Sequence, residues 1–306
     1  MTIDTAATID VATPIDTAAA DAAVASAATP ADPEQLIWLD GKVVAGSDAV
    51  LSASDHGLTV GDGVFETLKV VNGQPFALTR HLRRLASSAA GLGLPAPDDA
   101  QIRAAAAQLL GARVLPLARL RITWTSGPGP LGSHRGHGTP TLLLVSEPGT
   151  PWPATTSVAT VPWTRNPDSA VAGIKTTSYA ENVVALASAN ARGASEALFA
   201  NTRGELCEGT GSNVFVVLGG QVLTPPLSSG CLAGITREFV IEWCGAIEAS
   251  LPLGVLQSAD EVFLTSSTRD VHPVHQVDQR ELVAPGPLTA QVAARYAERA
   301  VELVDP

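Results

Sequence analysis

The sequence predicts an α+β fold organised as two domains. The first half combines hairpins with helices and further strands, and the second half combines short strands with helices. Between them lies a proline-rich stretch, Glu147-Pro148-Gly149-Thr150-Pro151-Trp152-Pro153, which cannot sustain a regular element. We expect a disordered extension over residues 1–34, a small α+β domain over 35–147, a linker over 148–154 and a large domain over 155–306.

In the small domain, turn residues and apolar periodicity define the elements. Asp40-Gly41 and Asn72-Gly73 are two-residue hairpin turns between strand-like segments. We expect Thr79 to cap a helix that ends near Gly93, and Asp98 or Asp99 to open a second helix that stops at Gly111. The predicted strands are Leu36–Leu39, Val43–Val44, Val64–Val71, Pro75–Leu78, Arg119–Thr125 and Thr141–Glu147.

The large domain is predicted to mix short strands with helices. The predicted strands are Ser157–Pro162, Glu196–Ala200, Asn213–Leu218, Gln221–Thr224 and Glu261–Thr265. The predicted helices begin near Ser178 and end at Arg192, run from Thr236 to Cys244, and run from Leu288 to about Leu303. No internal repeat is visible.

Composition limits the partners and the compartment. Acidic residues outnumber basic ones 30 to 19, which argues against nucleic acid or an anionic membrane surface as a partner. The three cysteines, Cys207, Cys231 and Cys244, form neither a metal-ligand spacing nor a disulfide framework. Residues 1–34 contain no Lys or Arg, and no apolar run is long enough to cross a bilayer. We therefore predict a cytoplasmic protein without a metal site.

Lys175 is one of only three lysines, with Lys42 and Lys69. The other two fit solvent-facing positions, whereas Lys175 lies just before a helix start where Ser178 and Glu181 have the spacing of a capping box. The field of a helix N-terminus and burial both lower the pKa of an amine. A neutral amine can form the Schiff base by which a lysine holds pyridoxal phosphate. The alternative is an ordinary surface lysine.

Four further features could serve such a cofactor. Glu208 lies in a loop of small residues between strands, where a carboxylate could face a pyridine nitrogen. Gly234-Ile235-Thr236 opens a helix whose N–H groups could bind an anion, and the hydroxyl cluster Thr265–Thr268 follows a strand. Arg80 and Arg84 share one helix face, from which an arginine could reach a phosphate. The alternatives are a glycine-rich turn, a hydrated helix end, a polar loop and a solvated basic face.

The order of these motifs resembles the fold-type IV, or class IV, family of pyridoxal-phosphate enzymes. That family includes branched-chain aminotransferases, D-amino-acid aminotransferases and 4-amino-4-deoxychorismate lyases, and the resemblance covers residues 36–300. It is carried by Asp55-His56-Gly57, Gly61–Glu66, His81–Arg84, Lys175, Glu208–Asn213, Gly234–Arg237 and Phe263–Val274. The resemblance implies a small N-terminal domain, a larger C-terminal domain with a β-barrel-like core, and a homodimer with its active site near the subunit boundary.

The resemblance also implies a role for each matching residue. Lys175 would hold the cofactor and move protons, and Glu208 would face the pyridine nitrogen. Tyr179, offset by one residue from the family position, would touch the ring oxygen. The phosphate would be bound by Arg84, Ile235, Thr236 and Ser267.

Within this family the segment Lys175–Asn182, followed by Gly193–Phe199, most resembles aminodeoxychorismate lyases. We therefore expect release of pyruvate and 4-aminobenzoate, a folate precursor. The alternatives are an amino-acid transaminase for D-amino or branched-chain substrates with 2-oxoglutarate or pyruvate, an inactive homologue that binds the cofactor, and an acidic interaction protein without cofactor.

One departure concerns the substrate carboxylate. Some family members carry an arginine where this chain has Ser126. His134, Arg135 or His137, in the following loop, could replace it, although a mobile polar loop is the other interpretation.

Overall fold

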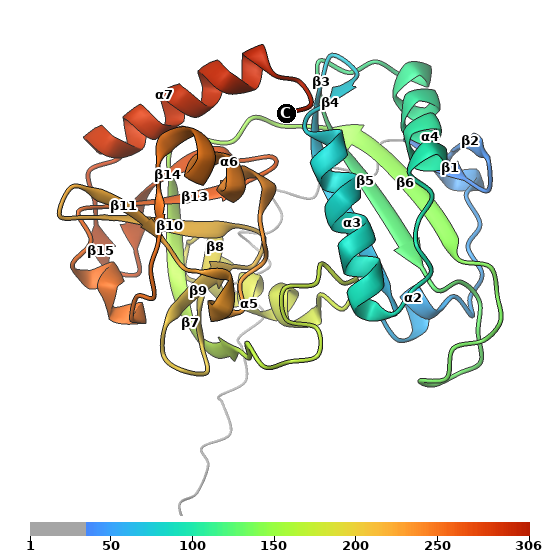
Figure 1. Cartoon of the computed structure of the whole chain (residues 1–306), viewed down its shortest axis with the longest axis horizontal. Coiled ribbons are helices and arrows are strands. Elements are labelled where there is room, and N and C mark those ends of the chain that lie inside the picture. The colour runs from blue at the N-terminus through green and yellow to red at the C-terminus, as the bar shows by residue number, and fades with distance from the viewer. Residues whose placement is uncertain (1–34) are drawn as a thin grey trace, which may run out of the picture. The chain divides into compact units, whose positions relative to one another are not determined.

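Two β-sheets, each with helices packed on it, make up the part of the chain that the computed structural model describes, residues 35–306 (Figure 1). The predicted extension over residues 1–34 lies outside this part. The described residues belong to one compact unit, Ala31–Pro306. The α+β class predicted from the sequence is confirmed.

The first sheet has six strands in the order β2-β1-β6-β5-β3-β4, all antiparallel to their neighbours. Its helices α3 and α4 cover one face, and a short helix, α2, lies near one end of the sheet (Figure 1). The bounds are β1 Leu36–Leu39, β2 Lys42–Ala45, α2 His56–Thr59, β3 Gly63–Val71, β4 Gln74–Pro75, α3 Leu78–Leu92, α4 Asp99–Ala112, β5 Leu117–Thr125 and β6 Thr141–Pro148.

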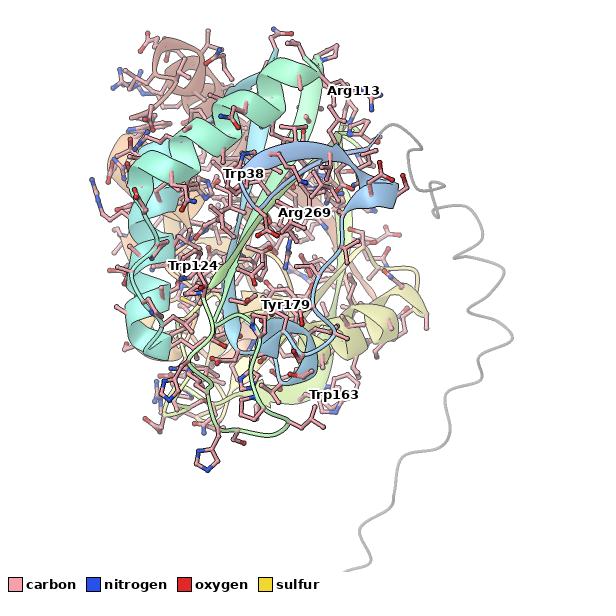
Figure 2. All side chains as sticks on the ribbon, turned by 90° about the vertical axis from the view of Figure 1, so that its right-hand side faces the viewer. Trp38, Arg113, Trp124, Trp163, Tyr179 and Arg269 are labelled. Atoms are coloured by element: carbon pink, nitrogen blue, oxygen red, sulfur yellow. The ribbon has the colours of Figure 1, made fainter. Side chains whose placement is uncertain are left out.

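Alternation along β3 and β5 separates the core from the second face of this sheet. Val64, Leu68 and Val70 are buried in the core beneath α3 and α4 together with Leu120 and Ile122. Because successive side chains of a strand point to opposite faces, the residues between them face away from these helices. Trp38 and Trp124, both labelled in Figure 2, belong to the same core.

The second sheet has nine strands and curls into a half-barrel. Its order is β12-β11-β10-β13-β14-β7-β8-β9, with β15 paired to β14. The strands are β7 Thr156–Arg165, β8 Glu196–Asn201, β9 Leu206–Gly209, β10 Asn213–Leu218, β11 Gln221–Thr224, β12 Ile247–Glu248, β13 Glu261–Ser266, β14 Asp270–Val277 and β15 Arg280–Glu281. The helices are α5 Ala180–Asn190, α6 Ile235–Cys244 and α7 Pro287–Glu302, and short 3-10 turns lie at Gly46–Asp48, Leu227–Ser229 and Leu253–Gln257.

The predictions for this sheet need correction at Glu208 and at β14. Glu208 belongs to strand β9 rather than to a loop, because residues 206–209 pair with β8. Strand β14 was not predicted; its residues pair with both β13 and β7. Pro148, the first residue of the predicted linker 148–154, is the last residue of β6. The other linker residues lie between β6 and β7, which belong to different sheets, while the proposed domain limits stay a prediction.

The side-chain caps predicted for α3 and α5 were wrong, because each residue has a partner far away in the sequence. Helix α5 has Tyr179 as its N-cap without a side-chain bond. Ser178 instead donates to the Gly61 carbonyl at 3.2 Å, and Glu181 pairs with Arg165. Helix α3 begins after Ala77, which has a left-handed backbone and supplies no cap.

The start of α3 is held by the last residues of the chain. The Asp305 carboxylate accepts from the Thr79 N–H at 2.8 Å and from the Thr79 hydroxyl at 2.6 Å. The Ala77 N–H donates to the Val304 carbonyl at 2.9 Å. An acidic group at this position both caps the helix and interacts favourably with its dipole.

Candidate active site

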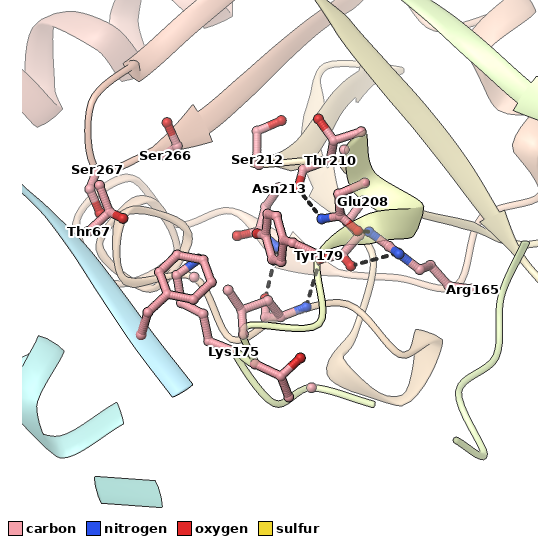
Figure 3. Close-up of a pocket in the computed structure, with 18 of the residues that line it drawn as sticks. Thr67, Arg165, Lys175, Tyr179, Glu208, Thr210, Ser212, Asn213, Ser266 and Ser267 are labelled. Carbon is pink, nitrogen blue, oxygen red and sulfur yellow. Dashed lines mark hydrogen bonds and ion pairs between the residues drawn. The ribbon is translucent and has the colours of Figure 1, made fainter. Parts of the chain in front are cut away.

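A cavity of about 590 Å³ lies between the two sheets, within the size range of small-molecule sites. Side chains of β3 and β5 form one wall, and β9, the start of α6 and the end of β13 form the others. Figure 3 shows Ser266 and Ser267 on one side, Glu208 and Arg165 on the other, and Lys175 between them. The candidate residues that line the cavity are Arg84, Lys175, Tyr179, Glu208, Ile235, Thr236 and Ser267.

Lys175 is held by backbone pairing with the start of β3. Its carbonyl accepts from the Phe65 N–H at 3.0 Å, and an isolated bridge pairs Val64 with Thr176. The amine lies 4.4 Å from the centroid of the Phe65 ring. Burial, followed by the positive charge of Arg84, lowers the pKa of Lys175 to about 8. A substantial fraction of this amine is therefore neutral near physiological pH and can act as a nucleophile.

At the Glu208 end, a carboxylate, an arginine and a phenol lie together. Glu208 accepts from Arg165 Nε at 3.2 Å and from the Leu232 N–H at 2.9 Å. Burial raises the pKa of Glu208 against the opposing pull of Arg165. Burial, together with the charge of Glu208, also raises the pKa of Tyr179 to about 12, so its hydroxyl stays protonated. Tyr179 packs edge-on against Phe65, with ring centroids 5.2 Å apart.

The opposite end of the cavity is built to bind an anion. Helix α6 begins at Ile235 with Gly234 as an N-cap that supplies no side-chain bond, so its first N–H groups have no partner within the helix. A Cβ at Gly234 would lie 1.8 Å from Asn213 Oδ1, so a larger residue there would force the Asn213 side chain to move. Thr265 lines the same cavity, and its buried hydroxyl has no hydrogen-bond partner among residues 35–306.

Arg84 reaches this anion end from α3. Its Nη1 donates to the Ala233 carbonyl at 2.9 Å, beside the start of α6. Its Nε and Nη2 are engaged by Glu66 at 2.8 Å and 2.6 Å. A guanidinium carries five N–H groups, so Arg84 retains donors for an anion in the cavity.

The sequence interpretation missed two arginines on β5. Arg119 and Arg121 alternate with the core residues of this strand and line the cavity. Arg119 pairs with Glu147 at 2.7 Å, whereas Arg121 stacks over Phe65, with Cζ 3.7 Å from the ring centroid. Within residues 35–306, Arg121 has no carboxylate partner. The spacing of the two arginines on a predicted strand was the available signal.

The loop residues proposed as substitutes for a substrate arginine do not line the cavity, which argues against that hypothesis. Arg135 is bound by Asp62, with Nε and Nη2 contacts of 2.7 Å and 2.6 Å. It also donates to the carbonyls of Leu92 and Gly93. These bonds tie the loop to the C-terminal end of α3 and to Asp62, just before β3.

The fold and the cavity define an α+β enzyme in which a reactive lysine lies between an anion-binding helix end and a buried carboxylate. The chain belongs to the amino-transferase class IV family, which matches residues 63–277. Its cofactor is pyridoxal phosphate, as the solved structures of similar chains show.

Three relatives show how far the similarity extends. A protein of Methanocaldococcus jannaschii named "Putative branched-chain-amino-acid aminotransferase" is 35% identical over 80% of this chain and 88% of its own. A D-alanine aminotransferase of Bacillus licheniformis is 30% identical over 84% and 94%. An aminodeoxychorismate lyase of Bacillus subtilis is 29% identical over 80% and 87%. The expected specific likeness to the lyases is therefore not supported, and the transaminase alternative is favoured.

Two solved structures extend the comparison to the fold. A "hypothetical aminotransferase" from Mycobacterium tuberculosis in its pyridoxal-phosphate-bound form is 28% identical, with a TM-score of 0.77 over 87% of this chain and 99% of that one. A branched-chain aminotransferase of the archaeon Thermoproteus uzoniensis, solved with norvaline, is also 28% identical, with a TM-score of 0.81 over 88% and 95%.

The residues present fit this cofactor. The open helix end and the unpartnered Thr265 hydroxyl suit a phosphate. Lys175 supplies an amine that is partly neutral, and Glu208 supplies a buried carboxylate. No group of three or more metal-binding side chains that could hold an ion occurs in residues 35–306. In the same range, no helix is both long and apolar enough to span a membrane.

Proposed function

We propose that this enzyme is a transaminase that moves an amino group from a branched-chain amino acid to 2-oxoglutarate. The proposal is carried by the position of Arg121, whose guanidinium has no carboxylate partner in the described part of the chain. It stacks on Phe65, whose ring also lies near the Lys175 amine, and it lines the cavity. A carboxylate of an amino acid or of 2-oxoglutarate is the ligand that such a group binds well. The greater identity to a branched-chain aminotransferase than to a lyase supports the same choice.

Each cavity residue then has a proposed task. Arg84, the N–H groups of Ile235 and Thr236, and the hydroxyl of Ser267 bind the phosphate. Glu208 keeps a proton at the ring nitrogen, and the Tyr179 hydroxyl donates to the ring oxygen.

When bound, pyridoxal phosphate delocalises the electron pair that an amino acid leaves on losing its α-proton. Lys175 Nζ, which is partly neutral because its pKa is about 8, takes this proton and returns it as general acid. Arg121 holds the substrate carboxylate and so fixes which bond faces the amine. The ring of Phe65, 3% exposed, shields this side of the cavity from water.

A second candidate is transfer from D-alanine, because a D-alanine aminotransferase is 30% identical over 84% of this chain. We also propose that the enzyme works as a homodimer. Neighbouring apolar side chains of α5, Val183 and Val184, are 64% and 48% exposed and suit burial by a second subunit. Light scattering on the purified protein would measure its mass, and a monomer under turnover conditions would contradict the dimer.

The function is tested by a visible spectrum of the purified holoenzyme followed by separate additions of substrate. We expect L-leucine to remove the absorbance band beyond about 400 nm and 2-oxoglutarate to restore it, with the keto acid of leucine as product. The same cycle with D-alanine alone would favour the second candidate. Turnover of aminodeoxychorismate alone, to pyruvate and 4-aminobenzoate, would overturn both and restore the lyase.

A further inference from the structure

Glu66 is a charged residue in an apolar position. It lies on the helix-facing side of β3, on the same face of the strand as Val64, Leu68 and Val70, and its side chain is 0% exposed. A buried carboxylate is costly unless charges and hydrogen bonds compensate it, and an apolar residue would satisfy the core equally well. The position therefore calls for a reason beyond packing.

Two side chains of α3 bind this carboxylate. Arg84 donates to Oε1 at 2.8 Å through Nε and to Oε2 at 2.6 Å through Nη2, and His81 Nδ1 lies 2.6 Å from Oε2. Burial alone would raise the pKa of Glu66, but the charge of Arg84 and these hydrogen bonds hold it at about 2. The carboxylate is therefore ionised throughout the physiological range.

Both partners of Glu66, Arg84 and His81, also contact residues at the anion end of the cavity. Arg84 Nη1 donates to the Ala233 carbonyl at 2.9 Å, just before α6. On the other side, His81 Nε2 lies 3.4 Å from the Ser267 hydroxyl, beyond the end of β13. Burial lowers the pKa of His81, so the ring is neutral and its Nδ1–H donates to Glu66. One carboxylate thus connects to two separate walls of the anion end.

We infer that Glu66 is a positioning residue for the cofactor phosphate, which it serves by orienting the Arg84 guanidinium. The inference rests on the proposed placement of the phosphate at the start of α6. A rigid arginine loses less freedom when it binds an anion, and its donors already point at the site. Glu66 itself touches neither cofactor nor substrate.

The test compares two ligands that differ only in the phosphate. Apoenzyme is titrated with pyridoxal phosphate and with pyridoxal, and binding is followed by absorbance and by quenching of tryptophan fluorescence. In Glu66→Gln, which preserves side-chain shape, we expect the affinity for pyridoxal phosphate to fall about tenfold to a hundredfold. The affinity for pyridoxal should stay unchanged.

Two further variants separate positioning from general stability. Glu261→Gln changes another buried carboxylate, which accepts from the N–H groups of Leu288 and Thr289 and does not line the cavity, so the ratio of the two affinities should remain that of the wild type. In an Arg84→Gln background, Glu66→Gln should cost little further affinity, because the group that it orients is gone. If Glu66→Gln does not fold, Glu66→Asp keeps the charge but cannot reach both partners.

The possible failures are distinguishable. Equal losses of both ligands in Glu66→Gln, or a full additional loss in the Arg84→Gln background, would overturn the positioning role. A wild-type apoenzyme that binds pyridoxal as tightly as pyridoxal phosphate would instead overturn the placement of the phosphate at α6, and with it the proposed site.

Discussion

Glu66 lies behind Arg84, which lines the cavity, whereas Glu208 lines the cavity itself. Each carboxylate is buried and paired with an arginine, yet their pKa values move in opposite directions. Glu66 is held at about 2, whereas the pKa of Glu208 is raised. The difference lies in their donors. Arg84 gives Glu66 two short bonds and His81 adds a third.

Glu208 has a weaker set of donors. Arg165 gives it one bond of 3.2 Å and divides its other donors between Glu181 and Asn182. Burial therefore dominates at Glu208, and its oxygens keep capacity for another partner. A nearby arginine therefore does not by itself decide the protonation state of a buried carboxylate. A saturated carboxylate suits positioning, and an unsaturated one suits contact with a ligand.

The largest effect is expected at Lys175, whose pKa burial and Arg84 lower although the charges of both carboxylates oppose this shift. Lys175→Ala should abolish the visible band of the holoenzyme and reduce turnover at least roughly a thousandfold, because nucleophile and proton carrier are lost together. Lys42→Ala, at an exposed position of β2, is the matched control and should behave as wild type. Retention of the band in Lys175→Ala would exclude this lysine.

Glu208→Gln should separate rate from binding. We expect kcat to fall about a hundredfold, because the amide cannot keep a proton at the ring nitrogen, while the affinity for pyridoxal phosphate changes much less. This is the reverse of the Glu66→Gln pattern. Glu181→Gln removes another partner of Arg165 and should have a smaller effect on kcat. Equal losses in the two variants would mean that the placement of Arg165 matters rather than the Glu208 carboxylate.

The two carboxylates should give opposite pH dependences to the stability of the apoenzyme. The pKa of Glu66 falls from an ordinary 4.5 to about 2 on folding. Its contribution to the free energy of unfolding, on the order of 3 kcal/mol, is therefore fully present above pH 4.5 and is lost as the pH falls through about 2. The pKa of Glu208 is raised on folding, so its contribution is present below 4.5 and is lost as the pH rises through its folded value.

Urea unfolding from about pH 2 to about pH 7 measures these slopes. Glu66→Gln should remove a slope in which stability increases with pH, and Glu208→Gln a slope in which it decreases. Slopes of the same sign would show that the two environments do not differ as described.

The smallest effect is expected at the cap of α3. Asp305→Asn weakens the bonds to Thr79 and should reduce the free energy of unfolding by about 1 kcal/mol. Because α3 carries both partners of Glu66, the preference for pyridoxal phosphate over pyridoxal should decrease slightly, with no change at Glu208. Glu302→Gln, an exposed neighbour that pairs with Arg299, is the control. An unaltered urea midpoint in Asp305→Asn would show that the cap contributes nothing.

Features set by neighbouring residues could be predicted from the sequence. Asn72 and Gly73 both have positive φ, as a hairpin turn of this type requires. Lys175 stood out because lysine is rare in this chain, and the structure places it in the cavity. Glu208, Arg84, the start of α6 and the hydroxyl cluster Thr265–Thr268 were also candidates on their own surroundings. The family resemblance then assigned their roles and added Tyr179, although it pointed to the lyases rather than the transaminases.

Features that depend on distant partners could not be predicted. Thr79 and Ser178 have the residue types of helix caps, but Asp305 and the Gly61 carbonyl compete for them. Glu66 was only part of a motif, since its partners lie on another element. Arg121 was overlooked because its value depends on which face of β5 meets the cavity. Each miss involves a contact between elements rather than a local propensity.

The capping of α3 by Asp305 has a consequence for synthesis. The ribosome makes α3 long before Asp305, which follows Thr79 by 226 residues. Until then the first N–H groups of the helix have only water as partner. Segments made early usually fold first, but the cap of α3 can form only after Asp305 has been made. Chains cut short before residue 304 would leave α3 frayed at the end nearest His81, and cellular proteases would meet that end first.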